Sequence, residues 1–402
     1  MKEKELLQKI NKTIKYCNDN VEFYQRKLKK IIDVDGVKSL EEFEMLPFTT
    51  KDDVKKNYPF GLKGAELKDI VAYNESSGTS SGDVNRSSRS ASFYTKNDVE
   101  KDIERRTNGD LKFSKEDIVF VALPYALTTS GLHFHMAASR KGAMVINADN
   151  GSQMANIRKQ VDLIRRLNPS VIITSYPFLI STMFYVLGVS ISELTNLRAI
   201  QLCGMSTSQN GKIKIGKIFN DVKVYDTYGM SEFGAITSSC DCGNAHINDD
   251  FYVEIINPKS LEKVEENVGG EIVITTFERE GSPKIRYRTG DVGKMSSKKC
   301  GCGRNSETIE VTGRLKDLFV INGKRFNLND IENVLYQKEE VAGMYKPVIA
   351  KEKVELTVDI LSDNYEEVAA SLKKDFSEKL EIETEIVCVV VGESPHWLRV
   401  QK

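Results

Sequence analysis

Short apolar runs alternate with longer segments of helical spacing through the middle of this 402-residue chain, and this alternation restricts the fold most. The apolar runs are rich in β-branched residues and bounded by turn signals, so they predict buried strands. They lie at 118–123, 143–146, 171–174, 199–203 and 222–225. Helical spacing recurs at 94–106, 132–138, 154–167 and 179–188. Strands that alternate with helices predict an α/β fold with a parallel sheet covered by helices.

The segments on either side of this alternation predict two further parts. Residues 1–69 show mostly helical spacing, and strands between residues 252 and 276 indicate a smaller antiparallel β element. From residue 314 the pattern changes to a hairpin signal, two helices and further strands. We therefore predict a large N-terminal domain over 1–313 and a small C-terminal α+β lid domain over 314–402.

Composition excludes several classes of protein. The formal net charge is −1 with 29% charged residues, so bulk charge favours no nucleic-acid partner. No apolar run approaches the ~20 residues that cross a bilayer, and the N-terminal residues are charged. The seven cysteines are odd in number and unevenly clustered, which argues against a disulfide framework. We predict a cytoplasmic protein without a membrane segment.

One loop combines two glycines with small hydroxyl side chains. It runs Glu-Ser-Ser-Gly-Thr-Ser-Ser-Gly-Asp over 75–83, directly after an apolar run at 70–73. Backbone N–H groups and hydroxyls in such a loop can form a nest for phosphate oxygens. The candidate phosphate-binding residues are Ser76, Ser77, Gly78, Thr79, Ser80 and Gly82. A flexible Ser/Gly linker explains the loop equally well when it is taken alone.

Three further segments carry residues suited to a nucleotide. Tyr228, Gly229 and Glu232 follow the predicted strand at 222–225, and ligands bind at the carboxyl ends of strands in open α/β sheets. The carboxylate of Asp291, in Arg-Tyr-Arg-Thr-Gly-Asp, suits hydrogen bonding to a ribose diol. Gly-Arg-Leu-Lys-Asp follows at 313–317. Each has a structural alternative: a core tyrosine, a turn-capping aspartate or a surface arginine.

In this order the segments resemble the adenylate-forming superfamily, most closely its phenylacetate–CoA ligase-like branch. That branch shows Ser-Ser-Gly-Thr, then Tyr-Gly-x-Ser-Glu, then Arg-Tyr-Arg-Thr-Gly-Asp, then Gly-Arg-x-x-Asp, and the resemblance covers nearly the whole chain. These enzymes condense a carboxylate with ATP to an acyl-AMP and pyrophosphate, then usually pass the acyl group to a thiol. The resemblance implies an AMP-forming acid–thiol ligase with a small-molecule carboxylic acid substrate, expected to be aromatic, and coenzyme A as acceptor.

The resemblance also implies roles for the nucleotide motifs. Glu232 would ligate Mg²⁺, a cation that prefers carboxylate and phosphate oxygens. Tyr228 would stack on adenine beside Gly229, and Gly204 would line the other face of the base. Asp291 would bind the ribose hydroxyls.

Other residues follow from the same resemblance. Arg314 would lie near the ribose, and Lys316 stands at the family's hinge, about which the small domain swings between the two half-reactions. Tyr125, His133 and Tyr176 are candidates for the acid pocket. A buried histidine with a satisfied partner is at least as good an explanation of His133.

Two departures from the family pattern stand out. The loop at 76–82 carries one extra residue, and the lysine that usually follows it is absent. Near residue 400, His396 stands in the place of the family's catalytic lysine, and Lys402 is the nearest lysine. A histidine is mostly neutral at pH 7, so it would replace that cation poorly. We expect that Lys402 does not supply the cation and that adenylation is slow, with His396 contributing when protonated.

Cysteine and histidine form a second constellation. Cys240-x-Cys242-x₃-His246 is followed by Cys300-x-Cys302, a set of soft and borderline ligands suited to tetrahedral Zn²⁺. The four favoured ligands of this structural zinc are Cys240, His246, Cys300 and Cys302, with Cys242 as the alternate. Polar neighbours disfavour the alternative, ordinary reduced cysteines buried as small hydrophobes. The ligands bound an insert at about 238–304.

Two rival functions stay open. Acyl transfer to a protein thiol, such as that of a carrier protein, or to an amine shares these motifs, and AMP release that depends on coenzyme A would separate the cases. A catalytically weakened nucleotide- or acyl-AMP-binding protein would show no ATP–pyrophosphate exchange with any acid. A homodimer is the assembly we consider.

Overall fold

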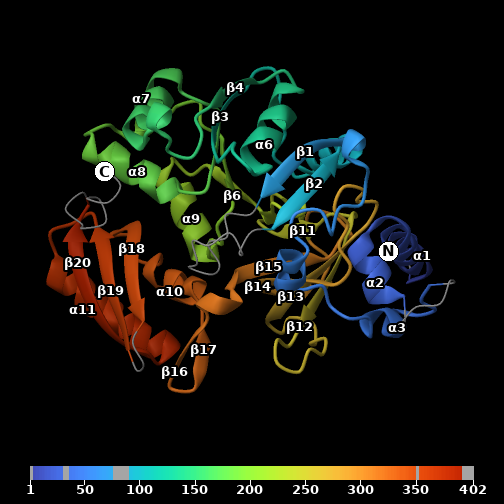
Figure 1. The fold of residues 1–402 in the computed structure, drawn as a ribbon. Coiled ribbons are helices and arrows are strands. Elements are labelled where there is room, and N and C mark those ends of the chain that lie inside the picture. Colours follow the sequence, from blue (N-terminus) through green and yellow to red (C-terminus); the bar gives the residue numbers. More distant parts are fainter. Residues whose placement is uncertain (1–2, 30–35, 76–89, 350–352, 392–402) are drawn as a thin grey trace. The chain divides into compact units, whose positions relative to one another are not determined.

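The computed structural model describes residues 3–29, 36–75, 90–349 and 353–391, and Figure 1 shows its elements. The chain forms two compact units, each built from three segments. The first comprises Met1–Ser114, Pro124–Lys141 and Asp226–Val311; the second comprises Lys115–Leu123, Gly142–Tyr225 and Thr312–Lys402. The boundary expected at residues 313 and 314 remains a prediction.

A five-stranded sheet with the order β4-β3-β5-β6-β7 includes all five expected strands. Their bounds are β3 (Ile118–Ala122), β4 (Met144–Asn147), β5 (Val171–Thr174), β6 (Ala199–Cys203) and β7 (Lys223–Thr227). Strand β3 pairs in parallel with β4 and β5, and β5 pairs in parallel with β6. Every residue of β5 and β6 is buried, which explains why these strands are continuously apolar. The predicted α/β class is confirmed.

Helices between these strands supply the rest of this core. They are α7 (Ile157–Leu167), α8 (Pro177–Val186) and α9 (Gln209–Ile218), with short 3₁₀ turns η3 (Gln153–Ala155) and η4 (Ile191–Glu193). Helix α7 begins where the Asn156 side chain accepts the N–H of Lys159, as an N-cap does. Its apolar face, including Ile164, packs with Ile172 and Ile200 of the sheet.

The C-terminal segment has a hydrophobic core of its own. Its elements are η5 (Leu315–Asp317), β16 (Phe319–Ile321), β17 (Lys324–Phe326), α10 (Leu328–Leu335), β18 (Val341–Ile349), β19 (Lys353–Ile360), α11 (Tyr365–Leu380) and β20 (Glu383–Val390). Strand β19 pairs antiparallel with β18 and parallel with β20. Leu335, Val358 and Phe376 meet in the core. The α+β character expected here is confirmed.

The first unit combines helices with a second sheet. Its earlier elements are α1 (Glu3–Asn20), α2 (Glu22–Leu28), α3 (Leu40–Glu44), α4 (Lys51–Lys56), η1 (Leu67–Asp69), β1 (Ile70–Glu75), β2 (Ala91–Thr95), α5 (Lys96–Arg105) and α6 (Ser130–Ser139). Later strands are β8 (Gly229–Met230), β9 (Gly234–Ala235), β10 (Thr237–Ser239), β11 (Ala245–Ile247), β12 (Phe251–Ile256), β13 (Gly270–Thr276), β14 (Tyr287–Ser296) and β15 (Thr308–Arg314). The sheet order is β10-β11-β15-β14-β13-β12.

The helix predicted over 94–106 begins too early. Tyr94 and Thr95 belong to strand β2, where they pair with Ala72 and Ile70 of β1. Helix α5 starts at Lys96, because the Thr95 side chain accepts the N–H of Asp98 and closes a capping box. The N-cap residue Thr95 therefore lies inside the segment 94–106 that the sequence predicts as a helix.

Candidate active site and metal-ligand cluster

Two predicted nucleotide-binding residues meet in the first unit. Tyr228 directly follows β7, and Asp291 lies in β14. The phenol of Tyr228 donates a hydrogen bond of 2.8 Å to Oδ2 of Asp291. Burial, and then the Asp291 carboxylate, raise the pKa of Tyr228 well above its ordinary value, so the phenol keeps its proton and remains a donor. An aromatic ring and a carboxylate are thus held side by side.

The backbone after Tyr228 turns tightly. The Tyr228 N–H donates to Thr237 Oγ1 at 2.9 Å. Gly229 begins the short strand β8, which pairs antiparallel with β9. A Cβ on Gly229 would lie 2.6 Å from the carbonyl oxygen of Gly234, closer than packed atoms approach. The glycine of this motif is therefore required by the close approach of β9, and the turn between the two strands carries Glu232.

Glu232 contacts Ser90, the residue directly before β2. Its carboxylate is buried and accepts a hydrogen bond of 2.7 Å from the Ser90 hydroxyl. The candidate residues Ser76, Ser77, Gly78, Thr79, Ser80 and Gly82 lie outside the described residues. Strands β1 and β2 flank them, and their pairing sets Glu75 opposite Ala91. The two flanks of the loop therefore lie together, and one of them contacts Glu232.

The candidates for the acid pocket in this unit have polar partners. Nδ1 of His133 lies 2.5 Å from Oδ2 of Asp102, and both side chains are buried. The alternative expected from the sequence, a buried histidine with a satisfied partner, accounts for this nitrogen. The Tyr125 hydroxyl lies 3.4 Å from Nδ1 of His135. Their role toward an acid remains a prediction.

Four other predicted residues belong to the second unit. Gly204 follows β6 with φ +90°, a left-handed conformation that favours glycine. The Tyr176 hydroxyl, at the start of α8, donates to Oε1 of Gln160 at 3.1 Å. Arg314 ends β15, and Lys316 lies in the 3₁₀ turn η5. His396 and Lys402 lie outside the described residues, so their roles remain predictions.

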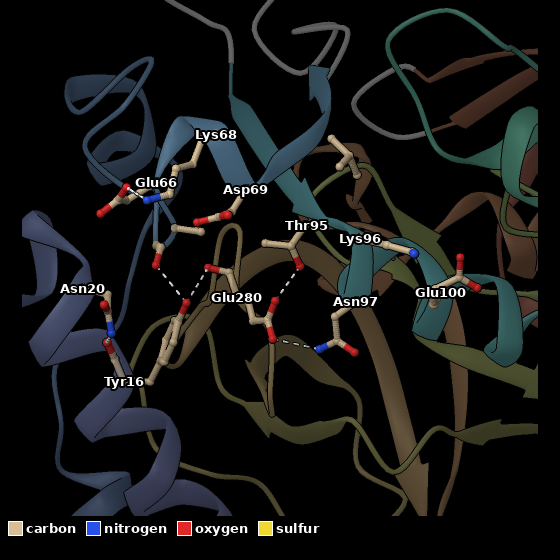
Figure 2. A pocket seen from close by; sticks show the side chains of 13 residues that line it. Tyr16, Asn20, Glu66, Lys68, Asp69, Thr95, Lys96, Asn97, Glu100 and Glu280 are labelled. Carbon is tan, nitrogen blue, oxygen red and sulfur yellow. Dashed lines mark hydrogen bonds and ion pairs between the residues drawn. The ribbon is translucent and has the colours of Figure 1, made fainter.

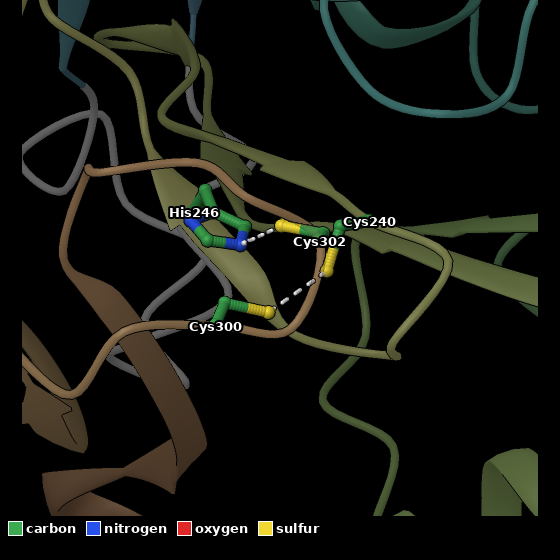
Figure 3. A group of neighbouring side chains, drawn as sticks. All are labelled: Cys240, His246, Cys300 and Cys302. Carbon is green, nitrogen blue, oxygen red and sulfur yellow. Dashed lines mark hydrogen bonds between the residues drawn. The ribbon is translucent and has the colours of Figure 1, made fainter.

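The four favoured metal ligands converge (Figure 3). Their ligand atoms all lie within 4.8 Å of one another. Sγ of Cys240 lies 3.6 Å from Sγ of Cys300, and Sγ of Cys302 lies 3.3 Å from Nε2 of His246. Cys242, the alternate ligand, is exposed and is not in this group. Two segments about 60 positions apart in sequence therefore present three thiols and an imidazole to one point.

Neighbouring polar groups prepare these side chains for a cation. Nδ1 of His246 lies 3.1 Å from the carbonyl oxygen of Ser306, so Nδ1 carries the hydrogen and Nε2 presents its lone pair. The backbone N–H of Cys302 and the Asn244 amide lower the pKa of Cys300 to about 5, which favours its thiolate. Burial raises the pKa of Cys240 to about 12. A bound cation would offset that cost.

Strand β10 connects the cluster to the nucleotide motif. Cys240 directly follows β10, whose Ser239 hydroxyl accepts the N–H of Asp226 at 2.7 Å. Thr237, at the other end of β10, accepts the N–H of Tyr228. Two hydrogen bonds from β10 therefore join the segment that carries Tyr228 to the strand that ends directly before Cys240.

Sequence reasoning missed the polar side chains around Glu232. Ser90, Tyr94, Asp102 and Arg105 all contact this residue or the turn that carries it. The available signal was an aspartate followed three and four positions later by arginines within an otherwise exposed helical pattern. Their partners are 128 to 142 positions away, so no local pattern identifies them.

An open cavity of about 840 Å³ lies elsewhere in the first unit (Figure 2). Tyr16 donates across it to the carbonyl oxygen of Gly64, and Glu280 accepts hydrogen bonds from Thr95 and Asn97. None of the predicted site residues that the structure describes lines it. No helix in the described part of the chain is long and apolar enough to cross a membrane.

Comparison with known proteins gives one family match. Residues 92–277 match the family described as "AMP-binding enzyme". The phenylacetate-coenzyme A ligase of Thermus thermophilus is 28% identical over 383 residues, covering 92% of this chain and 83% of that protein. That of Escherichia coli is 27% identical over 411 residues, covering 96% of this chain and 91% of that protein.

Solved structures agree in fold. A 2-hydroxyisobutyryl-CoA ligase in the postadenylation state superposes with a TM-score of 0.84 at 20% identity, covering 98% of this chain and 86% of that chain. An anthranilate CoA ligase gives 0.60 at 15% identity, covering 81% and 64%. At such identities these two structures establish the fold alone. Together with the family match and the relatives, they confirm that this chain resembles the adenylate-forming enzymes and, among them, the phenylacetate–coenzyme A ligases.

Proposed function

We propose that this chain is an AMP-forming ligase that joins a carboxylic acid to the thiol of coenzyme A. In the first step a carboxylate oxygen attacks the α-phosphorus of ATP, and pyrophosphate leaves with the electron pair of the broken P–O bond. In the second step the thiolate attacks the acyl carbonyl carbon, and AMP leaves. The observation that carries this proposal is that Tyr228 and Asp291 share a hydrogen bond and that Glu232 lies in the turn after Tyr228.

These three residues have the chemistry that the first step needs. The Tyr228 ring offers a flat face for adenine, and the Asp291 carboxylate accepts hydrogen bonds from ribose hydroxyls. Glu232 is the carboxylate that would hold Mg²⁺, and it contacts Ser90, which directly precedes β2, the strand that follows the loop proposed to bind phosphate. When bound, Mg²⁺ neutralises phosphate charge. Positioning and charge stabilisation are most of what such a transfer requires.

Other residues have proposed roles in the two half-reactions. Gly204 lines the base, Arg314 lies by the ribose, and Lys316 acts as the hinge of the C-terminal segment. Tyr125, His133 and Tyr176 contribute to the acid pocket. The relatives named phenylacetate-coenzyme A ligases support an aromatic acid as the substrate. A cytoplasmic location and a homodimer remain predictions.

We also propose that Cys240, His246, Cys300 and Cys302 hold a structural Zn²⁺. Zn–S bonds of about 2.3 Å in tetrahedral geometry set sulfur atoms about 3.8 Å apart. The 3.6 Å between Sγ of Cys240 and Sγ of Cys300 fits that spacing. Three thiols and one imidazole, with Nδ1 of His246 held by a carbonyl oxygen, are a ligand set that zinc prefers.

A panel assay tests the ligase. The purified chain is incubated with Mg²⁺·ATP and phenylacetate, anthranilate or 2-hydroxyisobutyrate, and pyrophosphate release is measured without coenzyme A. Coenzyme A is then added, and AMP and acyl-CoA are followed by mass spectrometry. We expect release with phenylacetate and acyl-CoA after addition. If the acyl-AMP reacts only with a carrier-protein thiol or an amine, coenzyme A is not the acceptor.

A second candidate function rests on the loop. Its extra residue and the lack of the usual lysine favour a weakened nucleotide- or acyl-AMP-binding protein. That protein would bind ATP without exchanging pyrophosphate with any acid of the panel.

A further inference from the structure

The turn that carries Glu232 is held along its backbone by buried side chains of β2 and α5. The Tyr94 hydroxyl donates to the carbonyl oxygen of Ser231 at 2.9 Å. Arg105 donates to the carbonyl oxygen of Phe233 at 3.2 Å. Both donors are buried. The peptide groups on either side of Glu232 are therefore anchored to the same two elements.

Asp102 holds the next part of this turn. Its Oδ1 accepts the N–H of Ala235 at 2.6 Å. Gly234 adopts φ +75°, and a Cβ there would lie 2.2 Å from Oδ1 of Asp102. A side chain at this position would displace either the turn or the carboxylate. Because Gly234 has no Cβ, the backbone of the turn lies directly against the Asp102 carboxylate, so a movement of one would displace the other.

Each polar partner of the Asp102 carboxylate in the described part of the chain is a hydrogen-bond donor. Oδ2 contacts Nδ1 of His133 at 2.5 Å and Arg106 at 3.0 Å, and Oδ1 also contacts Arg105 at 3.3 Å. Burial opposes ionisation, but Arg106, and then His133 and Arg105, hold the pKa of Asp102 well below its ordinary value. Asparagine at this position would place its NH₂ group against a hydrogen-bond donor in either orientation of the amide.

We propose that Asp102 and Tyr94 are positioning residues, which set the direction of the Glu232 carboxylate through the backbone of its turn. This rests on the proposed function in assigning Mg²⁺ to Glu232, whereas the hold on the turn rests on the contacts alone. Asp102 also binds His133, so helix α6, with its candidate acid-pocket residue, and the turn share one anchor. A displacement of helix α6 would therefore be transmitted to Glu232, the proposed Mg²⁺ ligand, through the Asp102 carboxylate.

The experiment compares Asp102→Asn, Tyr94→Phe and the control Tyr252→Phe, whose hydroxyl binds Glu44 instead. Hydrogen exchange of the peptide spanning 229–236 reports the turn without any ligand. Mn²⁺ binding in the presence of ATP, followed by the EPR signal of free Mn²⁺ and corrected for the Mn²⁺ that the same ATP binds without protein, reports the carboxylate. We expect faster exchange and Mn²⁺ affinity lower by about tenfold or more in the first two variants. The control should match the wild-type protein in both.

Wild-type exchange rates in a folded Asp102→Asn protein would overturn the proposal. If that variant does not fold, Tyr94→Phe decides it, because this change removes one hydroxyl and keeps the ring. Failure of the wild-type protein to bind Mn²⁺ with ATP would contradict the proposed function. The exchange rates of the turn would still decide whether Asp102 and Tyr94 hold it.

Discussion

The hydroxyl of Tyr228 lies 2.8 Å from Oδ2 of Asp291, and this hydrogen bond joins two motifs that are 63 positions apart in the sequence. The Asp291 N–H also donates to Thr289 Oγ1 at 3.0 Å, which fixes the backbone that carries the carboxylate. If adenine stacks on the ring and ribose binds the carboxylate, this contact sets the spacing between the base and the sugar.

Replacing Asp291 with alanine should weaken ATP binding more than it slows turnover. Hydrogen bonds to a charged group contribute about 1.5–3 kcal/mol, so KM for ATP should rise by about ten- to a hundredfold. Steady-state kinetics at saturating acid measure this. Tyr228→Phe keeps the ring and should raise KM less. An Asp291→Ala enzyme with wild-type KM for ATP would remove the ribose assignment.

Glu232→Gln should act through the metal. The amide keeps the shape of the side chain but loses the charge that Mg²⁺ prefers, so the Mg²⁺ concentration for half-maximal activity should rise by about tenfold or more. Mg²⁺ titrations at fixed ATP measure it. The matched control is Glu262→Gln at an exposed position. Equal Mg²⁺ requirements in both variants would contradict the role of Glu232.

Metal removal should destabilise the protein before it affects chemistry. The four ligands join β10 and β11 to the segment at 300–302, so a chelator should lower Tm. Cys300→Ser should lose the zinc, whereas Cys242→Ser should retain it, because Cys242 lies outside the ligand group. Elemental analysis and thermal unfolding test this. Protein purified without chelator that contains no zinc would exclude the site.

The features of the fold and of the candidate site that could be predicted are those that depend on residues close together in the sequence. The strands at 171–174 and 199–203 were predictable because burial on both faces makes them continuously apolar. The convergence of Cys240, His246, Cys300 and Cys302 was predictable because thiols and imidazole among polar neighbours have few uses other than metal binding. Strand β14 was missed, because its glycines and charged residues hide the alternation.

The polar contacts around Glu232 could not be predicted. The contact of Ser90 with Glu232 spans 142 positions, and that of Asp102 with Ala235 spans 133. Such pairs are set by how the chain packs. The requirement for Gly234 likewise follows from the position of a carboxylate on another element.

The segment near residue 400 gives a prediction about the catalytic cation. If His396 contributes only when protonated, adenylation should be faster at pH 5.5 than at pH 8.5, relative to a His396→Ala variant. His396→Lys should raise the rate at pH 8, because lysine stays charged there. Adenylation rates across this pH range test both. A severe loss in Lys402→Ala with none in His396→Ala would show that Lys402 supplies the cation.

Lys284 should make stability depend on pH. Its side chain is fully buried, and its ammonium donates to the carbonyl oxygen of Ser282 at 3.2 Å. Burial, and then the Arg279 cation, lower the pKa of Lys284 from 10.5 to about 8. Between these values the unfolded chain binds more protons than the folded one, so this group's contribution to stability rises with pH. Below pH 8 both states are charged, and the full cost of the buried charge, roughly 3 kcal/mol, is present.

Lys284→Met should remove this dependence. We expect the variant to gain free energy of unfolding relative to the wild-type protein near pH 7, and the gain to shrink as pH rises from 8 to 10.5. Urea unfolding at several pH values measures the difference, in which the other titrating groups largely cancel. Lys159→Met, at an exposed position, should show no such trend. A difference that stays constant with pH would mean that the ammonium is charged in both states throughout this range.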